Sequence, residues 1–202
     1  MKDSKKVSLF LNTATKVLEA GLLYGDQALE VKLGNPKTAL ETTNLGIEML
    51  LDSYDLKLAD VDAFYCLLGP GSNTGIRLGL TIPRTIYAFN PKILCFGIPT
   101  LELMTEEVPY AAISDRNGNL YFGERKEDKT VALKRVDKKD IDSLSALPSI
   151  ALEADDTMAL DSVKVKDIHK VRILDLMIAY RSKFKDFSAD EENYLPEYLL
   201  KI

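Results

Sequence analysis

The chain has 202 residues, which is enough for one or two domains with buried cores. Its 26 basic and 31 acidic residues give a net charge of −5, which disfavours strong stand-alone binding to nucleic acid. No apolar stretch approaches the roughly 18 residues of a membrane span, and the first apolar run is too short for a secretory signal. We therefore expect a cytoplasmic protein that does not contact the membrane.

Three strands are predicted at the start of the chain, over residues 7–11, 18–24 and 27–33. Gly34-Asn35-Pro36 ends the third strand. Apolar residues then recur at helical spacing and predict a helix over residues 38–53.

The most informative stretch comes directly after this helix. The apolar run from Ala63 to Leu68 predicts a strand buried on both faces, and Gly69-Pro70-Gly71 ends it. Ser72, Asn73 and Thr74 can cap a helix that begins near Gly75 and runs to residue 89.

This second helix contains a proline and leads into a further strand. Pro83 lies inside the helix and should kink it or remove one backbone hydrogen bond. A strand is predicted over residues 92–98, and Pro99-Thr100 opens a short helix.

The glycine-rich loop raises the question of a phosphate site, because free N–H groups at a helix N-terminus attract anions. Its spacing matches neither common fingerprint: Ile76 stands where a Walker loop has Lys, and Thr74 stands where a dinucleotide loop has Gly or Ala. The residues alone favour a tight strand-to-helix turn, and a phosphate cradle stays the alternative.

The second half begins with predicted strands over residues 110–114, 120–122 and 130–136, the first two joined by a hairpin turn at Asn117-Gly118. Asp137 can cap a short helix that ends at residue 144.

Two short strands are then predicted over residues 149–152 and 163–165. Asp167 can cap a final helix in which Ile168, Val171, Leu174 and Ile178 share one face. The apolar and aromatic tail over residues 194–200 is expected to dock onto the body of the protein.

The first half thus has three antiparallel strands and then alternating helices and strands, which is the ribonuclease-H-like arrangement. The second half begins the same pattern again. We therefore predict an α/β protein of two tandem ribonuclease-H-like domains, over residues 1–104 and 105–202, in the actin-like ATPase (ASKHA) superfamily.

The stretch Gly69-Pro70-Gly71-Ser72-Asn73-Thr74-Gly75-Ile76-Arg77 resembles the Gly-Pro-Gly-Ser-x-Thr-Gly-x-Arg signature of the TsaB family (YeaZ-type). Weaker matches lie at residues 11–15, 97–101, 112–116 and 196–199. The resemblance is good over residues 7–104, thin to residue 116 and close to absent over residues 124–185.

This resemblance implies a non-catalytic subunit required to make threonylcarbamoyladenosine on tRNA, at the adenosine next to the anticodon. It implies that the chain binds and activates the catalytic subunit TsaD as a heterodimer, through helices of its N-terminal domain. The ATPase TsaE would join them, and tRNA would be contacted only through the complex. A homodimer that masks the same helices when TsaD is absent is a further alternative, because two identical apolar surfaces can pair about a two-fold axis.

The residues themselves give little support to catalysis. A nucleotide-hydrolysing actin-like enzyme needs a carboxylate after its first strand, where this chain has Asn12. Asp115 lies one position later than the carboxylate of the family, where Ser114 stands. His169 is the single histidine, so one chain cannot form a two-histidine metal site. We expect no catalytic residue and no metal site.

Proteolysis is also disfavoured, because Ser72 has no obvious general base near it and the only histidine, His169, is expected in the final helix. The two cysteines, Cys66 and Cys95, lie in apolar runs, which predicts buried thiols with raised pKa values.

The sequence indicates two sets of site residues. The expected partner interface is formed by Leu40, Asn44, Ile47, Leu51, Gly75, Leu78, Gly79, Ile82 and Ile86. Gly75 and Gly79 are one helical turn apart and would let a partner helix approach closely, so a bulky residue at Gly79 should weaken pairing and leave the monomer folded.

The second set is a degenerate nucleotide or anion loop, formed by Asn12, Thr13, Gly71, Ser72, Thr74, Gly75 and Arg77. No cofactor is firmly implied, and ATP or ADP at this loop or at the partner interface is the alternative. The corresponding alternative function is an actin-like nucleotide-binding phosphotransferase or hydrolase that uses the loop from Gly71 to Gly75.

Overall fold

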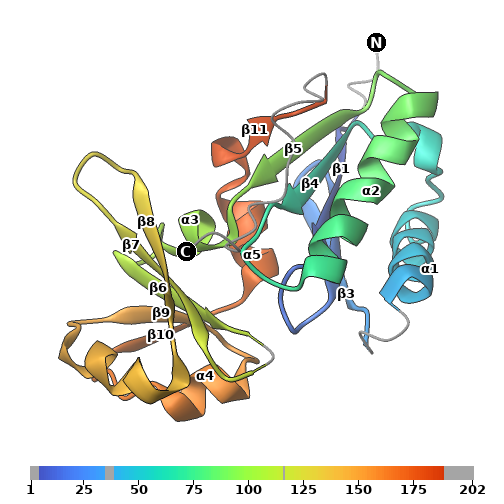
Figure 1. Cartoon of the computed structure of the whole chain (residues 1–202). Coiled ribbons are helices and arrows are strands. Elements are labelled where there is room, and N and C mark those ends of the chain that lie inside the picture. The colour runs from blue at the N-terminus through green and yellow to red at the C-terminus, as the bar shows by residue number, and fades with distance from the viewer. Residues whose placement is uncertain (1–4, 35–38, 116, 189–202) are drawn as a thin grey trace.

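The computed structural model describes residues 5–34, 39–115 and 117–188, which fold as an α/β protein with two mixed sheets (Figure 1). The mixed α/β class is thus as predicted. The predicted docking of residues 194–200 lies outside the described residues. None of the helices in the described part of the chain is long and apolar enough to span a bilayer.

The first sheet has the strand order β11-β5-β4-β1-β2-β3. Its first five strands in the chain are β1 (Val7–Asn12), β2 (Glu19–Tyr24), β3 (Gln27–Lys32), β4 (Ala63–Leu67) and β5 (Leu94–Ile98). β1 is antiparallel to β2 and parallel to β4, and its six residues are all buried. An unbroken apolar run is suited to such a central position, because helices cover both faces of the strand.

Two helices lie side by side on the outer face of the first sheet, α1 (Ala39–Asp52) and α2 (Asn73–Phe89), with the short helix η2 (Leu58–Asp60) between them in the chain (Figure 1). α2 begins two residues before the predicted Gly75, because the Ser72 hydroxyl already accepts a hydrogen bond from the Gly75 N–H at 3.2 Å. Pro83 lies inside α2 as predicted.

The second sheet has the order β10-β9-β6-β7-β8. Its strands are β6 (Tyr110–Ser114), β7 (Leu120–Arg125), β8 (Val131–Val136), β9 (Ile150–Glu153) and β10 (Ile168–Val171). β6 is antiparallel to β7 and parallel to β9, as β1 is to β2 and β4. The order β10-β9-β6-β7-β8 therefore repeats the order β5-β4-β1-β2-β3 of the first sheet.

The structure corrects the predicted helix over residues 167–178. Residues 168–171 form strand β10 and pair in parallel with β9, and α5 (Ile173–Ala179) begins only after Arg172. The β-branched Ile168 and Val171 have a spacing that is equally compatible with a helix, and the pairing with β9 favours the strand.

Two smaller expectations in the second half are also wrong, the strand over residues 163–165 and the cap by the Asp137 side chain. Residues 163–165 form no strand and instead come after the unpredicted helix α4 (Thr157–Ser162). The helix after Asp137 is the 3₁₀ helix η3 (Lys138–Ala146), and the Asp137 side chain makes no capping hydrogen bond to it.

The end of the described chain returns to the first sheet. After α5 and the short helix η4 (Arg181–Lys183), β11 (Lys185–Asp186) pairs antiparallel with the edge strand β5. The division into domains over residues 1–104 and 105–202 stays a prediction. One strand from the second of these ranges, β11, nevertheless belongs to the first sheet.

Two helices from different halves lie between the sheets, α5 and α3 (Thr100–Met104) (Figure 1). α5 contacts β1 and β2, whereas α3 contacts β6, β7 and β8. Leu101 of α3 and Leu174 of α5 are fully buried members of one apolar core that also includes Ala111 and Ala151 of the second sheet. The main core is therefore continuous across the two sheets.

Candidate functional site

The glycine loop packs against the segment that comes after β1. The Thr13 hydroxyl donates a 2.7 Å hydrogen bond to the Gly75 carbonyl oxygen. A Cβ atom at Gly75 would lie 1.7 Å from the Thr13 carbonyl oxygen, and one at Gly79 would lie 2.5 Å from Thr13 Oγ1. Both glycines therefore accommodate Thr13 of their own chain, and the expectation that they admit a partner helix is wrong.

Three N–H groups of this loop donate hydrogen bonds within the chain. Ser72 N donates to the Ala14 carbonyl oxygen at 2.6 Å, Ile76 N donates to the Ser72 carbonyl oxygen at 2.8 Å, and Gly75 N is capped by Ser72. A Cβ atom at Gly71 would lie 2.2 Å from the same Ala14 oxygen. These contacts favour a structural turn over an anion cradle, since three N–H groups of the loop already have acceptors within the chain.

The remaining loop residues differ in exposure. Thr74 and Arg77 are exposed, whereas Asn12 and Thr13 are buried. The Asn12 side chain lies between Thr15, at 3.1 Å, and Glu19, at 3.4 Å. It is therefore part of a buried hydrogen-bond network, in which it holds neighbouring side chains.

Asp115, the best carboxylate candidate in the second half, organises the β6–β7 turn. It accepts hydrogen bonds from the N–H groups of Asn117 and Asn119, and it pairs with Arg135 at 3.3 Å. These bonds lower its pKa although burial acts in the opposite direction. The preceding Ser114 directs both its N–H and its hydroxyl to Asp156.

Three carboxylates are buried where the two sheets meet, and sequence reasoning missed all of them. They are Glu19 of β2, Glu153 of β9 and Asp156, which caps α4. Lys16 bonds Asp156 at 3.1 Å, and Arg172 bonds Glu19 at 3.3 Å, so each of these ion pairs joins the first sheet to the second. No local pattern predicts such a cluster, because its members are far apart in the sequence.

The surroundings shift the pKa values of two of these carboxyl groups in opposite directions. Burial raises the pKa of Glu153 to about 7; the hydrogen bond from Thr15 acts in the opposite direction, and the nearby carboxylates of Asp156 and Glu19 add to the increase. Burial also raises the pKa of Asp156, but hydrogen bonds from Ser114, Ala159 and Lys16 outweigh it and lower that pKa overall. Glu153 is thus the one of the two that can be neutral near pH 7.

The cysteines and the histidine are in places unsuited to catalysis. Burial raises the pKa of the Cys66 thiol well above its ordinary value and that of Cys95 to about 12, as their apolar runs predicted. His169 is on β10 and pairs with Asp167 at 3.2 Å, so its predicted place in a helix is wrong. Among the described residues, no group of three or more His, Cys, Asp or Glu side chains is arranged so that it could hold a metal ion.

The outer helices present an apolar surface to solvent. Leu45 and Met49 of α1 are 55% and 53% exposed, and Leu40 is also exposed. From the predicted interface, Asn44 is exposed as well, and Leu78, Ile82 and Ile86 of α2 are half-buried. Ile47 and Leu51 are buried in the core.

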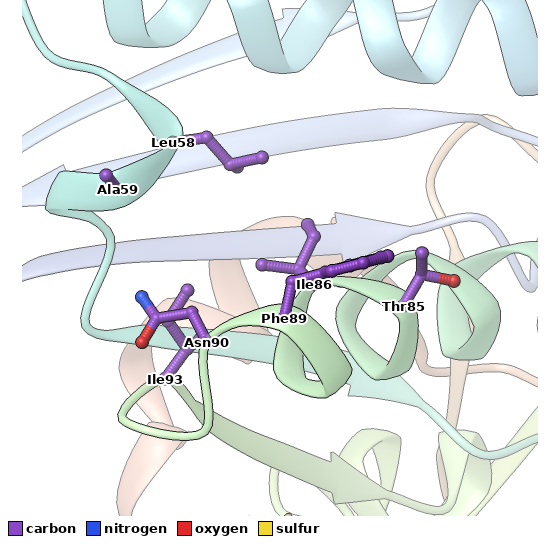
Figure 2. A pocket seen from close by; sticks show the side chains of 7 residues that line it. All are labelled: Leu58, Ala59, Thr85, Ile86, Phe89, Asn90 and Ile93. Atoms are coloured by element: carbon purple, nitrogen blue, oxygen red, sulfur yellow. The ribbon is translucent and has the colours of Figure 1, made fainter.

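The C-terminal end of α2 borders an open apolar hollow of about 230 Å³ (Figure 2). Phe89 is 88% exposed, and its ring lies at the rim across from Leu58 of η2. The hollow is lined by Leu58, Ala59, Thr85, Ile86, Phe89, Asn90 and Ile93.

Leu45, Met49, Leu58 and Phe89 were not predicted as interface residues. The signal for the first two was present in the sequence, because the apolar residues of α1 cover more of the helix than the one stripe that faces the sheet. We refer to the exposed or half-buried residues Leu40, Leu45, Met49, Leu58, Leu78, Ile82, Ile86 and Phe89 as the α1–α2 surface. An apolar area of this kind on a folded chain is typical of a protein-binding surface.

Comparison with known proteins finds similarity in both sequence and structure. No protein-family model matches the chain. The chain is 32% identical over 130 residues to the uncharacterized protein MG208 homolog of Mycoplasma pneumoniae (strain ATCC 29342 / M129 / Subtype 1). That alignment covers 61% of this chain and 65% of the relative, so the chain spans just under two thirds of the relative's length.

Among solved structures, YeaZ from Pseudomonas aeruginosa matches with a TM-score of 0.69 and 17% identity, over 96% of this chain and 100% of that chain. A second structure, of an uncharacterized protein with similarity to peptidase YEAZ from Pseudomonas aeruginosa, matches with a TM-score of 0.68 and 18% identity, over 96% and 99% of the two chains. The chain therefore has the fold of YeaZ along nearly its whole length.

Proposed function

We propose that the chain is a non-catalytic partner subunit in the formation of threonylcarbamoyladenosine on tRNA, and that it binds and activates TsaD. The observation that carries the proposal is the α1–α2 surface, where Leu45 and Met49 are more than half exposed on a helix that packs on the sheet with its other face. The YeaZ fold and the central signature around Gly71 support the same function.

The proposal includes the architecture that such a subunit would have. The repeated strand order supports two tandem ribonuclease-H-like units of the actin-like ATPase class. In this proposal TsaE joins the heterodimer in the cytoplasm, and tRNA is bound through the complex, which suits a net charge of −5. Without TsaD, the same apolar surface could pair with a second copy about a two-fold axis.

The proposed role requires no nucleotide in this chain. The enzyme alternative would need a carboxylate at the end of β1, and the buried amide of Asn12 is bonded to its neighbours there. We therefore propose that any ATP or ADP in the assembly is bound by another subunit.

Light scattering after gel filtration tests the proposal directly, with this protein mixed with TsaD from the same organism at micromolar concentrations. We expect a stable one-to-one species. Absence of a complex would remove the main support, and a magnesium-dependent rise in melting temperature with ATP would instead revive the enzyme alternative.

Calorimetric measurement of TsaD affinity with two matched variants tests whether the α1–α2 surface is the binding surface. Met49→Glu places a charge on the α1–α2 surface and should weaken TsaD binding at least tenfold, because it would desolvate a carboxylate in the interface. Met158→Glu makes the same change at an exposed methionine of α4, on the second sheet, and should leave the affinity unchanged. Equal effects of the two variants would count against the assignment of this surface.

A further inference from the structure

The shortest side-chain contact across the junction of the two sheets joins Thr15 to Glu153. Thr15 comes after β1, and Glu153 is the last residue of β9 and only 3% exposed. Thr15 Oγ1 lies 2.6 Å from Glu153 Oε1. It also lies 3.1 Å from Asn12 Oδ1 and 3.1 Å from the Val17 carbonyl oxygen.

The number of protons at Thr15 limits what this arrangement can be. A hydroxyl has one proton and can donate one hydrogen bond, but three acceptor atoms surround Thr15 Oγ1 if Glu153 is ionised. If Glu153 is neutral, its own O–H donates to Thr15 Oγ1, and Thr15 donates onward to Asn12 or Val17. In the ionised form Thr15 can donate to the carboxylate across the 2.6 Å contact, but Asn12 Oδ1 and the Val17 carbonyl oxygen then lack its proton. Only the neutral form brings a second proton to this cluster.

The charges around Glu153 also favour the neutral form. Three other carboxylates are close by, those of Glu19, Asp155 and Asp156. Three cations reach this junction, and each is paired with carboxylates other than that of Glu153: Lys16 bonds Asp156, Lys32 bonds Asp155, and Arg172 bonds Glu19, Glu30 and Asp175. Ionisation of Glu153 would therefore add a buried negative charge among negative charges.

We propose that Glu153 is a proton-operated latch between the two sheets, closed when its neutral carboxyl group donates to Thr15 and loosened when it ionises. Ionisation removes the second proton from the cluster, so the Thr15 hydroxyl alone faces three acceptor atoms and can donate to only one of them. The carboxylate also repels Glu19 and Asp156, which belong to opposite sides of the junction. The packing of the two sheets against each other then depends on pH in the neutral range, because burial raises the pKa of Glu153 to about 7.

The latch does not depend on the proposed role with TsaD, and it can be tested on this chain alone. In wild-type protein labelled with ¹³C, the side-chain carboxyl carbon of Glu153 should titrate with a midpoint near 7. The assignment comes from the spectrum of Glu153→Gln, which lacks this signal. A midpoint near the ordinary value of about 4.3 would overturn the proposal.

Hydrogen exchange tests whether the backbone next to Glu153 loosens. After correction for intrinsic rates, the amides of Ala154, which donates to the Val171 carbonyl oxygen, and of Asp156, which donates to the Glu153 carbonyl oxygen, should exchange about tenfold faster at pH 8 than at pH 6. Glu153→Gln cannot ionise and its amide can still donate to Thr15, so this pH dependence should disappear.

The matched control is Glu127→Gln, on the exposed β7–β8 loop. This variant should keep the pH dependence of hydrogen exchange that the wild type shows. If amide exchange in Glu153→Gln depends on pH as it does in the wild type, Glu153 has only a packing role and the latch is overturned. If Glu153→Gln does not fold, selective ¹³C labelling and the wild-type carboxyl titration still decide the question.

Discussion

Thr13 and Gly75 are in contact through both their backbones and the Thr13 side chain. The Thr13 hydroxyl bonds the Gly75 carbonyl oxygen, and the Thr13 carbonyl oxygen occupies the space that a Cβ atom of residue 75 would need. This contact fixes the start of α2 against the end of β1. Because a backbone oxygen cannot move aside as a flexible side chain can, even a single methyl group at residue 75 should be costly.

We therefore expect Gly75→Ala to lower the free energy of unfolding by about 3 kcal/mol, at the upper end of the range for overpacked sites. Urea unfolding measures this change, and Thr74→Ala, at the exposed neighbouring position, is the control and should change it by less than about 0.5 kcal/mol. A Gly75→Ala variant as stable as the wild type would show that the loop relaxes away from Thr13.

Phe89 should contribute to binding and little to stability. Its ring is 88% exposed at the rim of the hollow, so Phe89→Ala should change the free energy of unfolding by less than about 0.5 kcal/mol. The same substitution at the fully buried Phe10 should cost about 3–5 kcal/mol. If the α1–α2 surface binds TsaD, calorimetry should show weaker binding by Phe89→Ala, and unchanged affinity would place the hollow outside the interface.

Asp156 should make the free energy of unfolding depend on pH in the acidic range. Its folded-state pKa is lowered, so its stabilising contribution is present above the unfolded value of 3.8 and is lost as the pH falls through the folded value. We expect Asp156→Asn to cost about 1.5–3 kcal/mol at pH 6, because hydrogen bonds to a charged acceptor are lost. Urea unfolding between pH 6 and pH 2 should show the two proteins converging below pH 4, and a constant difference would contradict the assignment.

Arg172 should stabilise the junction through Glu19. It bonds Glu19 at 3.3 Å and Glu30 at 2.9 Å, and its removal would leave the buried Glu19 carboxylate without that cation. Arg172→Met should therefore lower the free energy of unfolding by about 1–3 kcal/mol in chemical denaturation. Lys170→Met, at an exposed position of β10, is the control, and an equal loss there would indicate a general charge effect.

The sequence predicted the elements whose signals are local. The apolar run of β4, the break at Gly69 and the cap at Ser72 all lie within about ten residues, and the structure has each of them in place. The strands of the first sheet were predicted for the same reason, except β11, which has only two residues. The β6–β7 hairpin was predicted from its turn residues, Asn117 and Gly118.

The sequence failed where a distant segment decides between two local conformations. Ile168 and Val171 fit a helix face as well as a strand, and the pairing of β10 with β9 determines the outcome. Gly75 and Gly79 indicate a close backbone approach, but the pattern cannot tell whether the approaching group is a partner helix or Thr13, 62 residues away from Gly75.

The sequence by itself therefore determined the order of the main strands and helices, the buried strand-loop-helix at the centre and the resemblance that it carries. Only the tertiary structure decided which apolar residues of α1 and α2 stay exposed, and it alone brought Thr15 and Glu153 together across 138 positions. The physical reason is that periodicity and capping act over one or two turns of chain. Burial, charge clustering and hydrogen-bond partners across the sheets depend on how distant segments pack.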